Sequence, residues 1–212
     1  MKREIRTDIV EKMFTISSSN AFVISSLRLL IPIGKERFKC CVAGVLSLFP
    51  TIMMAVSYDT ITMFVDSVQT SLEIVLALFG IVFTGYALFQ ALIGKEMLIR
   101  MLQSVTNKRG KEISKLQESN ELFAETMMLQ FLCIGISFLL LVAFKCVPTD
   151  WCLFEDKAKN DFLAGLGIFM YFYVMFNAVI EIKSFVFNMI ELFNFHAGTR
   201  VIELLQEPEK EN

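Results

Sequence analysis

Residues 72–93 read LEIVLALFGIVFTGYALFQALI, an apolar run whose one charged residue, Glu73, lies at its start. About 20 apolar residues in a helix are needed to cross the ~30 Å hydrocarbon layer of a membrane. The run therefore predicts a transmembrane helix. Small residues recur along it at spacings of three and four, which places them on one stripe of the helix. This small-residue stripe consists of Ala77, Gly80, Thr84, Ala87, Ala91 and Gly94.

Small residues in such a stripe let two membrane helices approach closely. Close packing is what holds helices together where lipid offers no hydrophobic driving force. We therefore expect the stripe to be a surface for helix packing and assembly. Its partner stays open at this point. One candidate is the 40–58 helix of the same chain, whose Gly44, Ser47 and Thr51 form a second small stripe, and the other is the same helix of another copy.

Three further apolar runs reach the length of a membrane span: 40–58, 127–147 and 162–182. The whole chain of 212 residues is 55% hydrophobic. Soluble domains average about 45–50%. Backbone groups inside a bilayer have no water to bond, so these runs are expected to be helices. The sequence predicts an all-α, polytopic membrane protein with four transmembrane helices in a bundle.

Basic residues are distributed unevenly between the segments that flank these runs. The segments 1–39, 94–126 and 183–212 hold 17 of the 20 lysines and arginines. An excess of Lys and Arg marks the cytoplasmic side of a membrane. Both termini and the middle segment are therefore expected in the cytoplasm, with the short segments 59–71 and 148–161 as outside loops.

The middle segment, 94–126, is too long for a simple turn and predicts a helical hairpin with a break at 107–110. Apolar residues recur on both of its arms and predict either a docking surface for a cytoplasmic partner or a hairpin that packs only on itself. These residues are Leu98, Met101, Val105, Ile113, Leu116 and Phe123.

The two ends of the chain are expected to be helical and cytoplasmic. Residues 1–16 place isoleucines on one helical face, and 22–33 is too short to span and predicts a helix lying on the membrane surface. After the fourth span an amphipathic helix is expected to reach about residue 195, with a break at Gly198.

Motifs for catalysis or cofactor binding are missing from the sequence, and its single histidine, His196, cannot form a metal cluster. We expect a non-enzymatic protein with no cofactor and no nucleic-acid partner. Two pairings stay open: an ion pair between Glu73 and Lys145, and a disulfide between Cys146 and Cys152. Three uncharged polar residues in the spans are expected to bond between helices or to line a pore. They are Gln90, Gln130 and Asn177.

A four-span protein with cytoplasmic helical extensions resembles, in architecture, the membrane effectors of bacterial defence and toxin–immunity systems. That resemblance implies a bacterial cytoplasmic membrane and a role as an effector or accessory subunit. The sequence thus predicts a protein that self-associates or anchors a cytoplasmic or membrane partner. The alternative is an oligomeric pore or ion channel gated from the cytoplasmic side.

Overall fold

The structure, a computed structural model, describes residues 19–32, 37–108, 111–148 and 154–206. Its elements are α2 (Ser19–Leu27), η1 (Arg28–Leu30), α3 (Arg37–Ala55), α4 (Thr60–Leu92), α5 (Lys95–Gln103), β1 (Val105–Lys108), β2 (Lys111–Ser114), α6 (Lys115–Cys146) and α7 (Lys157–Gln206). The helix expected in 1–16 lies outside the described residues.

Helices α3, α4, α6 and α7 are each long and apolar enough to cross a membrane. The all-α class with four such helices is therefore confirmed. Large apolar side chains are exposed on their surfaces: Phe38 is 77% exposed, Phe49 71% and Phe187 67%. Soluble monomers rarely expose extensive apolar patches. A surface of this kind is suited to lipid.

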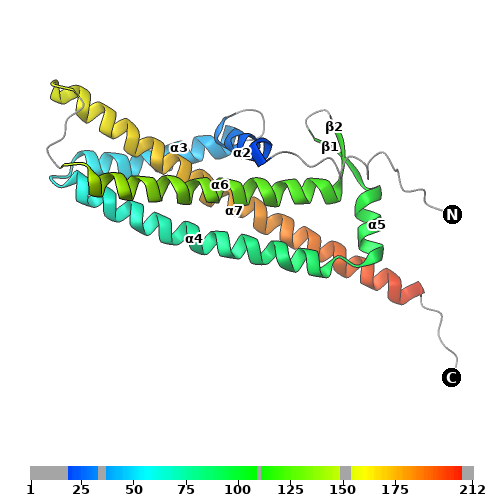
Figure 1. The fold of residues 1–212 in the computed structure, drawn as a ribbon. Coiled ribbons are helices and arrows are strands. Elements are labelled where there is room, and N and C mark those ends of the chain that lie inside the picture. Colours follow the sequence, from blue (N-terminus) through cyan, green and yellow to red (C-terminus); the bar gives the residue numbers. More distant parts are fainter. Residues whose placement is uncertain (1–18, 33–36, 109–110, 149–153, 207–212) are drawn as a thin grey trace.

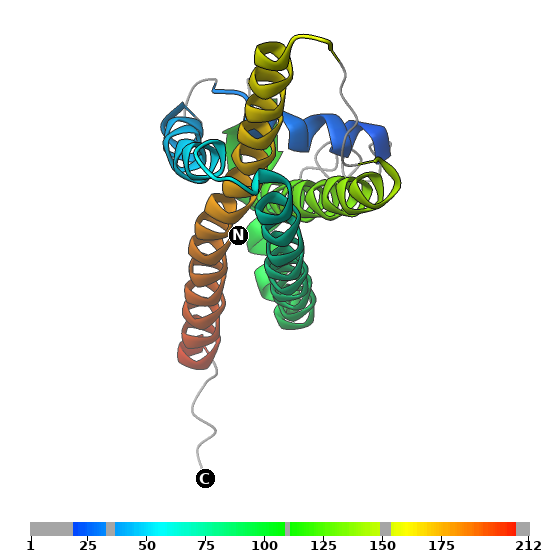
Figure 2. The same ribbon diagram turned by 90° about the vertical axis from the view of Figure 1, so that its left-hand side faces the viewer.

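Helix α7 lies at the centre of the arrangement (Figures 1 and 2). Helix α3 packs mainly on α7, whereas α4 and α6 pack on each other and on α7. In α3 the buried positions include Cys40, Ala43 and Ser47. Of the small stripe of α3 only Ser47 is buried, and a Cβ at Gly44 would meet no atom within 4 Å. Because the stripe of α4 is exposed, the expectation that the two stripes face each other is wrong.

Two apolar clusters form the core. The first lies toward the turn that joins α3 to α4, which we call the turn end, and includes Val68, Leu129 and Phe172. The second lies toward α5 and the β-ribbon, which we call the ribbon end, and includes Phe89 and Phe123. Figure 1 shows α5 running across the bundle at the ribbon end.

The connection between α3 and α4 is much shorter than expected. The apolar run begins at Leu72, so the sequence predicts a loop over 59–71, which holds Asp59 and Asp66, but α4 already begins at Thr60. The Asp59 side chain accepts a hydrogen bond from the Thr62 backbone N–H at 3.4 Å, as an N-terminal cap does. The predicted loop is therefore wrong: Asp59 caps the helix, and Asp66 is part of it.

The middle segment also differs from the expected helical hairpin. Helix α5 ends at Gln103, and β1 and β2 form an antiparallel ribbon in which Thr106 pairs with Ile113. The expected break at 107–110 includes the last two residues of β1, and the rest of it lies outside the described residues. Valine and threonine before the turn favour extended backbone, which explains why strands replace the helix ends.

The structure also shows where the α2–η1 segment packs and where α7 ends. The α2–η1 segment packs on α6 and α7, with Leu29 buried in the first cluster. Helix α7 continues through Gly198 to Gln206, so the predicted break there is wrong. An isolated glycine weakens a helix but does not by itself end it.

Candidate functional site

Five residues of the small-residue stripe, from Ala77 to Ala91, lie on the surface of α4, and Gly94 follows the helix as the N-terminal cap of α5. All six residues of the stripe are exposed. A Cβ added at Gly80 or Gly94 would meet no other atom within 4 Å. In the most apolar window of α4 only 17% of residues are buried, the lowest share among the four long helices. The stripe is therefore not used for packing within the chain, and of its two candidate partners the 40–58 helix is excluded.

A groove runs beside the stripe, between α4 and α7, with a volume of about 500 Å³. The α4 wall is formed by Ala77, Gly80, Ile81, Thr84, Gly85 and Leu88, and the α7 wall by Phe185 and Met189. Both walls are mainly apolar. The small side chains on one wall leave space for atoms of a second helix to approach the α4 backbone.

The opposite side of α4 packs inside the bundle through large side chains. Val68, Val75, Val82 and Phe89 recur every seven residues and are almost fully buried. Gly85 lies beside them, and a Cβ on it would be 2.6 Å from the Phe185 ring. Gly85 is thus the glycine that close packing requires. Its burial was not predicted, because a single glycine outside the three-and-four spacing gave no signal.

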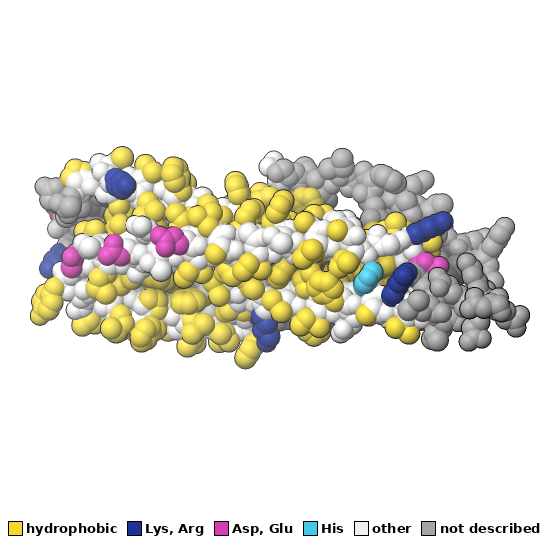
Figure 3. Space-filling view, turned by 90° about the horizontal axis from the view of Figure 1, so that it is seen from below, with side chains coloured by type: hydrophobic (Ala, Val, Ile, Leu, Met, Phe, Trp, Pro, Cys, Tyr) yellow, Lys and Arg dark blue, Asp and Glu magenta, His cyan; other side chains and the backbone are white. Residues whose placement is uncertain are grey.

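The exposed stripe continues toward the turn end as a row of carboxylates. Asp59, Asp66 and Glu73 precede Gly80 at seven-residue intervals, and all three are exposed. Seven residues are close to two helical turns, so these positions follow one line along α4. Figure 3 shows acidic side chains succeeding one another near the turn end of this face. The exposed line is therefore acidic in one part and uncharged in the next.

Neither Asp66 nor Glu73 is paired by the described part of the chain. No hydrogen bond or ion pair joins either carboxylate to a described residue. The pairing of Glu73 with Lys145, left open above, is thus not formed. Cys152, the other half of the possible disulfide with Cys146, lies outside the described residues.

Most residues expected on the cytoplasmic hairpin are buried in the chain's own core. Met101, Ile113, Leu116 and Phe123 are between 0% and 7% exposed. Phe123 packs against the rings of Tyr86, Phe89 and Phe185 at centroid distances of 5.3 to 5.6 Å. Only Leu98 and Val105 in that set are exposed. The ribbon end thus packs largely on the bundle.

The three uncharged polar residues of the spans do not form one group. Gln90 is exposed and donates to the Asn120 side chain at 3.3 Å. Asn177 donates to the Tyr173 carbonyl of its own helix at 2.8 Å. Gln130 is 1% exposed, and neither atom of its amide has a partner among the described residues.

Charged and polar side chains are buried between the two apolar clusters. Lys39 of α3 donates to Glu181 of α7 at 2.7 Å, and the Glu181 side chain is only 5% exposed. Ser25 of α2 donates to the buried Glu125 of α6. On α6, Glu125 lies between Phe123 of one cluster and Leu129 of the other. We call these charged residues, together with the buried Thr126 and Gln130 of α6, the polar layer: Lys39, Glu125, Thr126, Gln130 and Glu181.

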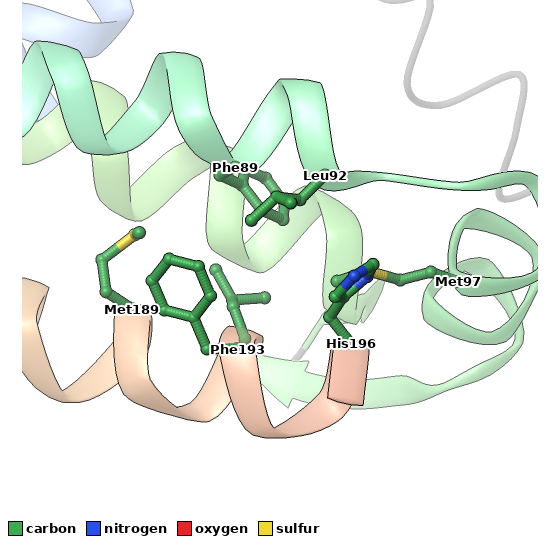
Figure 4. Close-up of a pocket in the computed structure, with 7 residues that line it drawn as sticks. Phe89, Leu92, Met97, Met189, Phe193 and His196 are labelled. Carbon is green, nitrogen blue, oxygen red and sulfur yellow. The ribbon is translucent and has the colours of Figure 1, made fainter. Parts of the chain in front are cut away.

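A small cavity lies at the ribbon end. Where α4, α5 and α7 meet, Met97, Phe193 and His196 line a cavity of about 10 Å³ (Figure 4). That volume is about the smallest that holds one water molecule. Among the described residues, no group of three or more His, Cys, Asp or Glu could hold a metal ion.

Together the fold and this surface define an all-α protein with four helices long and apolar enough to cross a membrane and one face of α4 left uncovered. The chain matches no protein-family model, no curated protein and no solved structure at a significant level.

Proposed function

We propose that this chain is a non-enzymatic integral membrane protein that associates with another transmembrane helix through the exposed face of α4. The observation that carries the proposal is the exposure of all six small residues, with no atom near the Cβ position of Gly80. Helix α4 packs within the chain through the large residues of one side, and the small residues of its other side are left free.

The physical reason is the weakness of other forces between helices in lipid. Large apolar side chains gain little by leaving lipid for protein, because both surroundings are apolar. Backbones that approach closely gain dispersion contacts and weak Cα–H···O bonds instead. Gly80, Ala87 and Ala91 allow that approach. The exposed side chains of Ile81 and Leu88 lie beside them and line the groove.

The charge distribution supports an orientation with both termini and the ribbon end in the cytoplasm. The architectural resemblance to bacterial membrane effectors supports a cytoplasmic membrane of a bacterium and a role as an effector or accessory subunit. In this orientation Asp59 and the turn end face the outside of the cell.

The test enlarges the stripe and follows association in lipid nanodiscs or by cross-linking in native membranes. Gly80→Leu and Ala87→Leu should each abolish the complex, because a leucine keeps the two backbones apart. Gly135→Leu is the matched control, since a Cβ at Gly135 of α6 also meets no atom within 4 Å. It should leave the complex intact. Complexes of unchanged size in Gly80→Leu and Ala87→Leu would contradict the proposal.

A second candidate is an oligomeric pore, which the polar layer favours. Lys39, whose side chain is 25% exposed, pairs near the start of α3 with the buried carboxylate of Glu181, and ionisable groups held among apolar helices often mark an ion path. Ion flux through liposomes decides this candidate. A flux that Glu181→Gln changes supports a pore, whereas no flux at high protein load contradicts it.

A further inference from the structure

A cavity of about 250 Å³ opens at the turn end, between the start of α7 and the neighbouring ends of α4 and α6. Figures 1 and 2 show that the first turns of α7 diverge from both helices there. Most of the side chains around the cavity are apolar. They include Phe64 of α4, Leu140 and Phe144 of α6, and Ala164, Gly167 and Ile168 of α7. We call this space the wedge cavity.

The chain closes the wedge cavity on its inner side and leaves it open on the α7 side. The ring of the buried Phe64 contacts those of Phe144 and Tyr171, at centroid distances of 5.6 Å and 5.4 Å. On α7, by contrast, Ala164 and Gly167 are exposed, and a Cβ added at Gly167 would meet no other atom within 4 Å. The described part of the chain therefore does not fill the space, and another molecule can enter it.

The wedge cavity lies within the apolar spans, close to their boundary at the turn end. Its α6 residues belong to the apolar run 127–147 and its α7 residues to the run 162–182, each about the length that crosses the hydrocarbon layer. The Thr60 hydroxyl, at the start of α4, donates to the Met54 carbonyl near the end of α3 at 2.9 Å, so these two helix ends share one level. Lipid acyl chains surround the spans at this depth. An acyl chain is therefore the occupant that suits the apolar lining of the cavity.

Two charged side chains of α7 precede the wedge cavity on the same face of the helix. Lys157 and Asp161 come seven and three residues before Ala164, and these spacings place all three on one face. Both charged side chains are exposed, and no ion pair or hydrogen bond joins either of them to a described residue. Lys159, in the same turn, is paired with Asp156 at 3.8 Å. The face that lines the cavity thus begins with one cation and one anion that the described chain leaves unpaired.

This pair of charges matches a phosphoethanolamine headgroup. Side chains at i and i+4 of a helix have Cβ atoms about 5–6 Å apart, and the headgroup carries a phosphate and a primary ammonium at the ends of a short ethyl link. Lys157 attracts the phosphate, and the Asp161 carboxylate accepts charge-assisted hydrogen bonds from the ammonium. A phosphoglycerol headgroup has no cation to offer Asp161, and the quaternary ammonium of choline has no N–H to donate. The chemistry therefore favours ethanolamine over both.

We propose that the wedge cavity is a binding site for one phospholipid with a phosphoethanolamine headgroup. One acyl chain of the lipid fills the cavity, and the headgroup lies between Lys157 and Asp161 at the boundary. The bound lipid replaces the side-chain contacts that Ala164 and Gly167 are too small to make, and it joins the start of α7 to α4 and α6. The site is separate from the exposed small-residue face of α4, so it does not depend on association with another helix.

The test is a lipid titration of the full-length protein in detergent micelles, followed by native mass spectrometry. Lipids with identical acyl chains and phosphoethanolamine, phosphocholine or phosphoglycerol headgroups are compared through the dissociation constant of the first bound molecule. The phosphoethanolamine lipid should bind at least about tenfold more tightly than the phosphoglycerol lipid, as expected for one hydrogen bond gained to a charged group. The phosphocholine lipid should lie between them.

The headgroup contacts are tested by the double variant Lys157→Gln with Asp161→Asn. Both side chains are exposed, so the variant should fold as the unmodified protein does. Its binding of the phosphoethanolamine lipid should weaken at least about tenfold, to the level of the phosphoglycerol lipid. Lys159→Gln with Asp156→Asn is the matched control, because it also neutralises a lysine and an aspartate beside the start of α7. It should leave binding unchanged.

The acyl-chain contact is tested by Gly167→Phe, which fills the cavity and should abolish tight binding of the first lipid. Gly165→Phe is the matched control, since a Cβ at Gly165 also meets no atom within 4 Å and Gly165 is not among the described residues that line the cavity. It should bind the lipid as the unmodified protein does. Thermal unfolding in detergent checks that both variants fold.

Equal binding of the phosphoethanolamine lipid and either of the other two lipids would overturn the inference. So would tight binding that survives Gly167→Phe, because the acyl chain would then lie elsewhere. A headgroup preference that survives the double variant at Lys157 and Asp161 would overturn it as well. The double variant changes only exposed side chains, so it decides the question even where Gly167→Phe does not fold.

Discussion

The two faces of α4 have the same seven-residue repeat and opposite uses. On one face Val68, Val75, Val82 and Phe89 are buried against α6 and α7. On the other, Asp66, Glu73, Gly80 and Ala87 are exposed. The contrast teaches that small residues do not by themselves show where a chain packs on itself. Here the internal contact is made by large side chains and one glycine, and the small residues stay free.

The largest expected effect comes from truncating one large residue on each face. Phe89→Ala should lower the free energy of unfolding by about 3–5 kcal/mol, because it leaves a cavity in the second cluster. Leu88→Ala, at a neighbouring position that is 50% exposed, should lower it by less than about 1 kcal/mol. Unfolding titrations in detergent measure both. Equal losses would show that the two faces are equally packed.

A smaller effect, with opposite signs on the two faces, is expected from adding one methyl group. Gly85→Ala places a Cβ 2.6 Å from the buried Phe185 ring and should cost about 1–3 kcal/mol. Gly80→Ala meets no atom within 4 Å and should gain about 0.5–1 kcal/mol, because alanine favours a helix over glycine. The same titrations compare them. A loss in Gly80→Ala would mean that this face is covered.

The smallest change in the free energy of unfolding is expected from replacing two glutamines, one buried and one exposed. Gln130→Met removes a buried amide with no partner among the described residues and should raise the free energy of unfolding by about 1 kcal/mol. Gln90→Met changes an exposed side chain with one long hydrogen bond and should change it by less than about 0.5 kcal/mol. A loss in Gln130→Met would show that its amide is hydrogen-bonded in the folded protein.

The sequence was sufficient for the four apolar helices, because their length and hydropathy follow directly from the bilayer as a solvent. The sequence was not sufficient to predict which side of α4 is covered by other helices. Both sides repeat every seven residues, and lipid and protein are about equally apolar, so hydropathy does not separate an inside from an outside. Only the placement of α6 and α7 against Val82 and Phe89 distinguishes them.

Local signals explain the other differences. Asp59 and Asp66 lie in the segment predicted as a loop, although a helix capped by Asp59 tolerates an exposed carboxylate at Asp66. Gly198 predicts a break in the helix, although α7 continues past it. The polar layer could not be foreseen, since Lys39 and Glu181 are 142 positions apart and only the fold brings them together.

The Lys39–Glu181 pair also has a mechanical consequence. Helix α7 has 50 residues, which makes it about 75 Å long, and Glu181 divides it almost in half. The pair therefore joins α3 to the midpoint of a lever. A tilt of α7 by about 5° around that pivot moves each end by about 3 Å in opposite directions. Any rigid tilt about this point would therefore move the two ends of α7 in opposite senses.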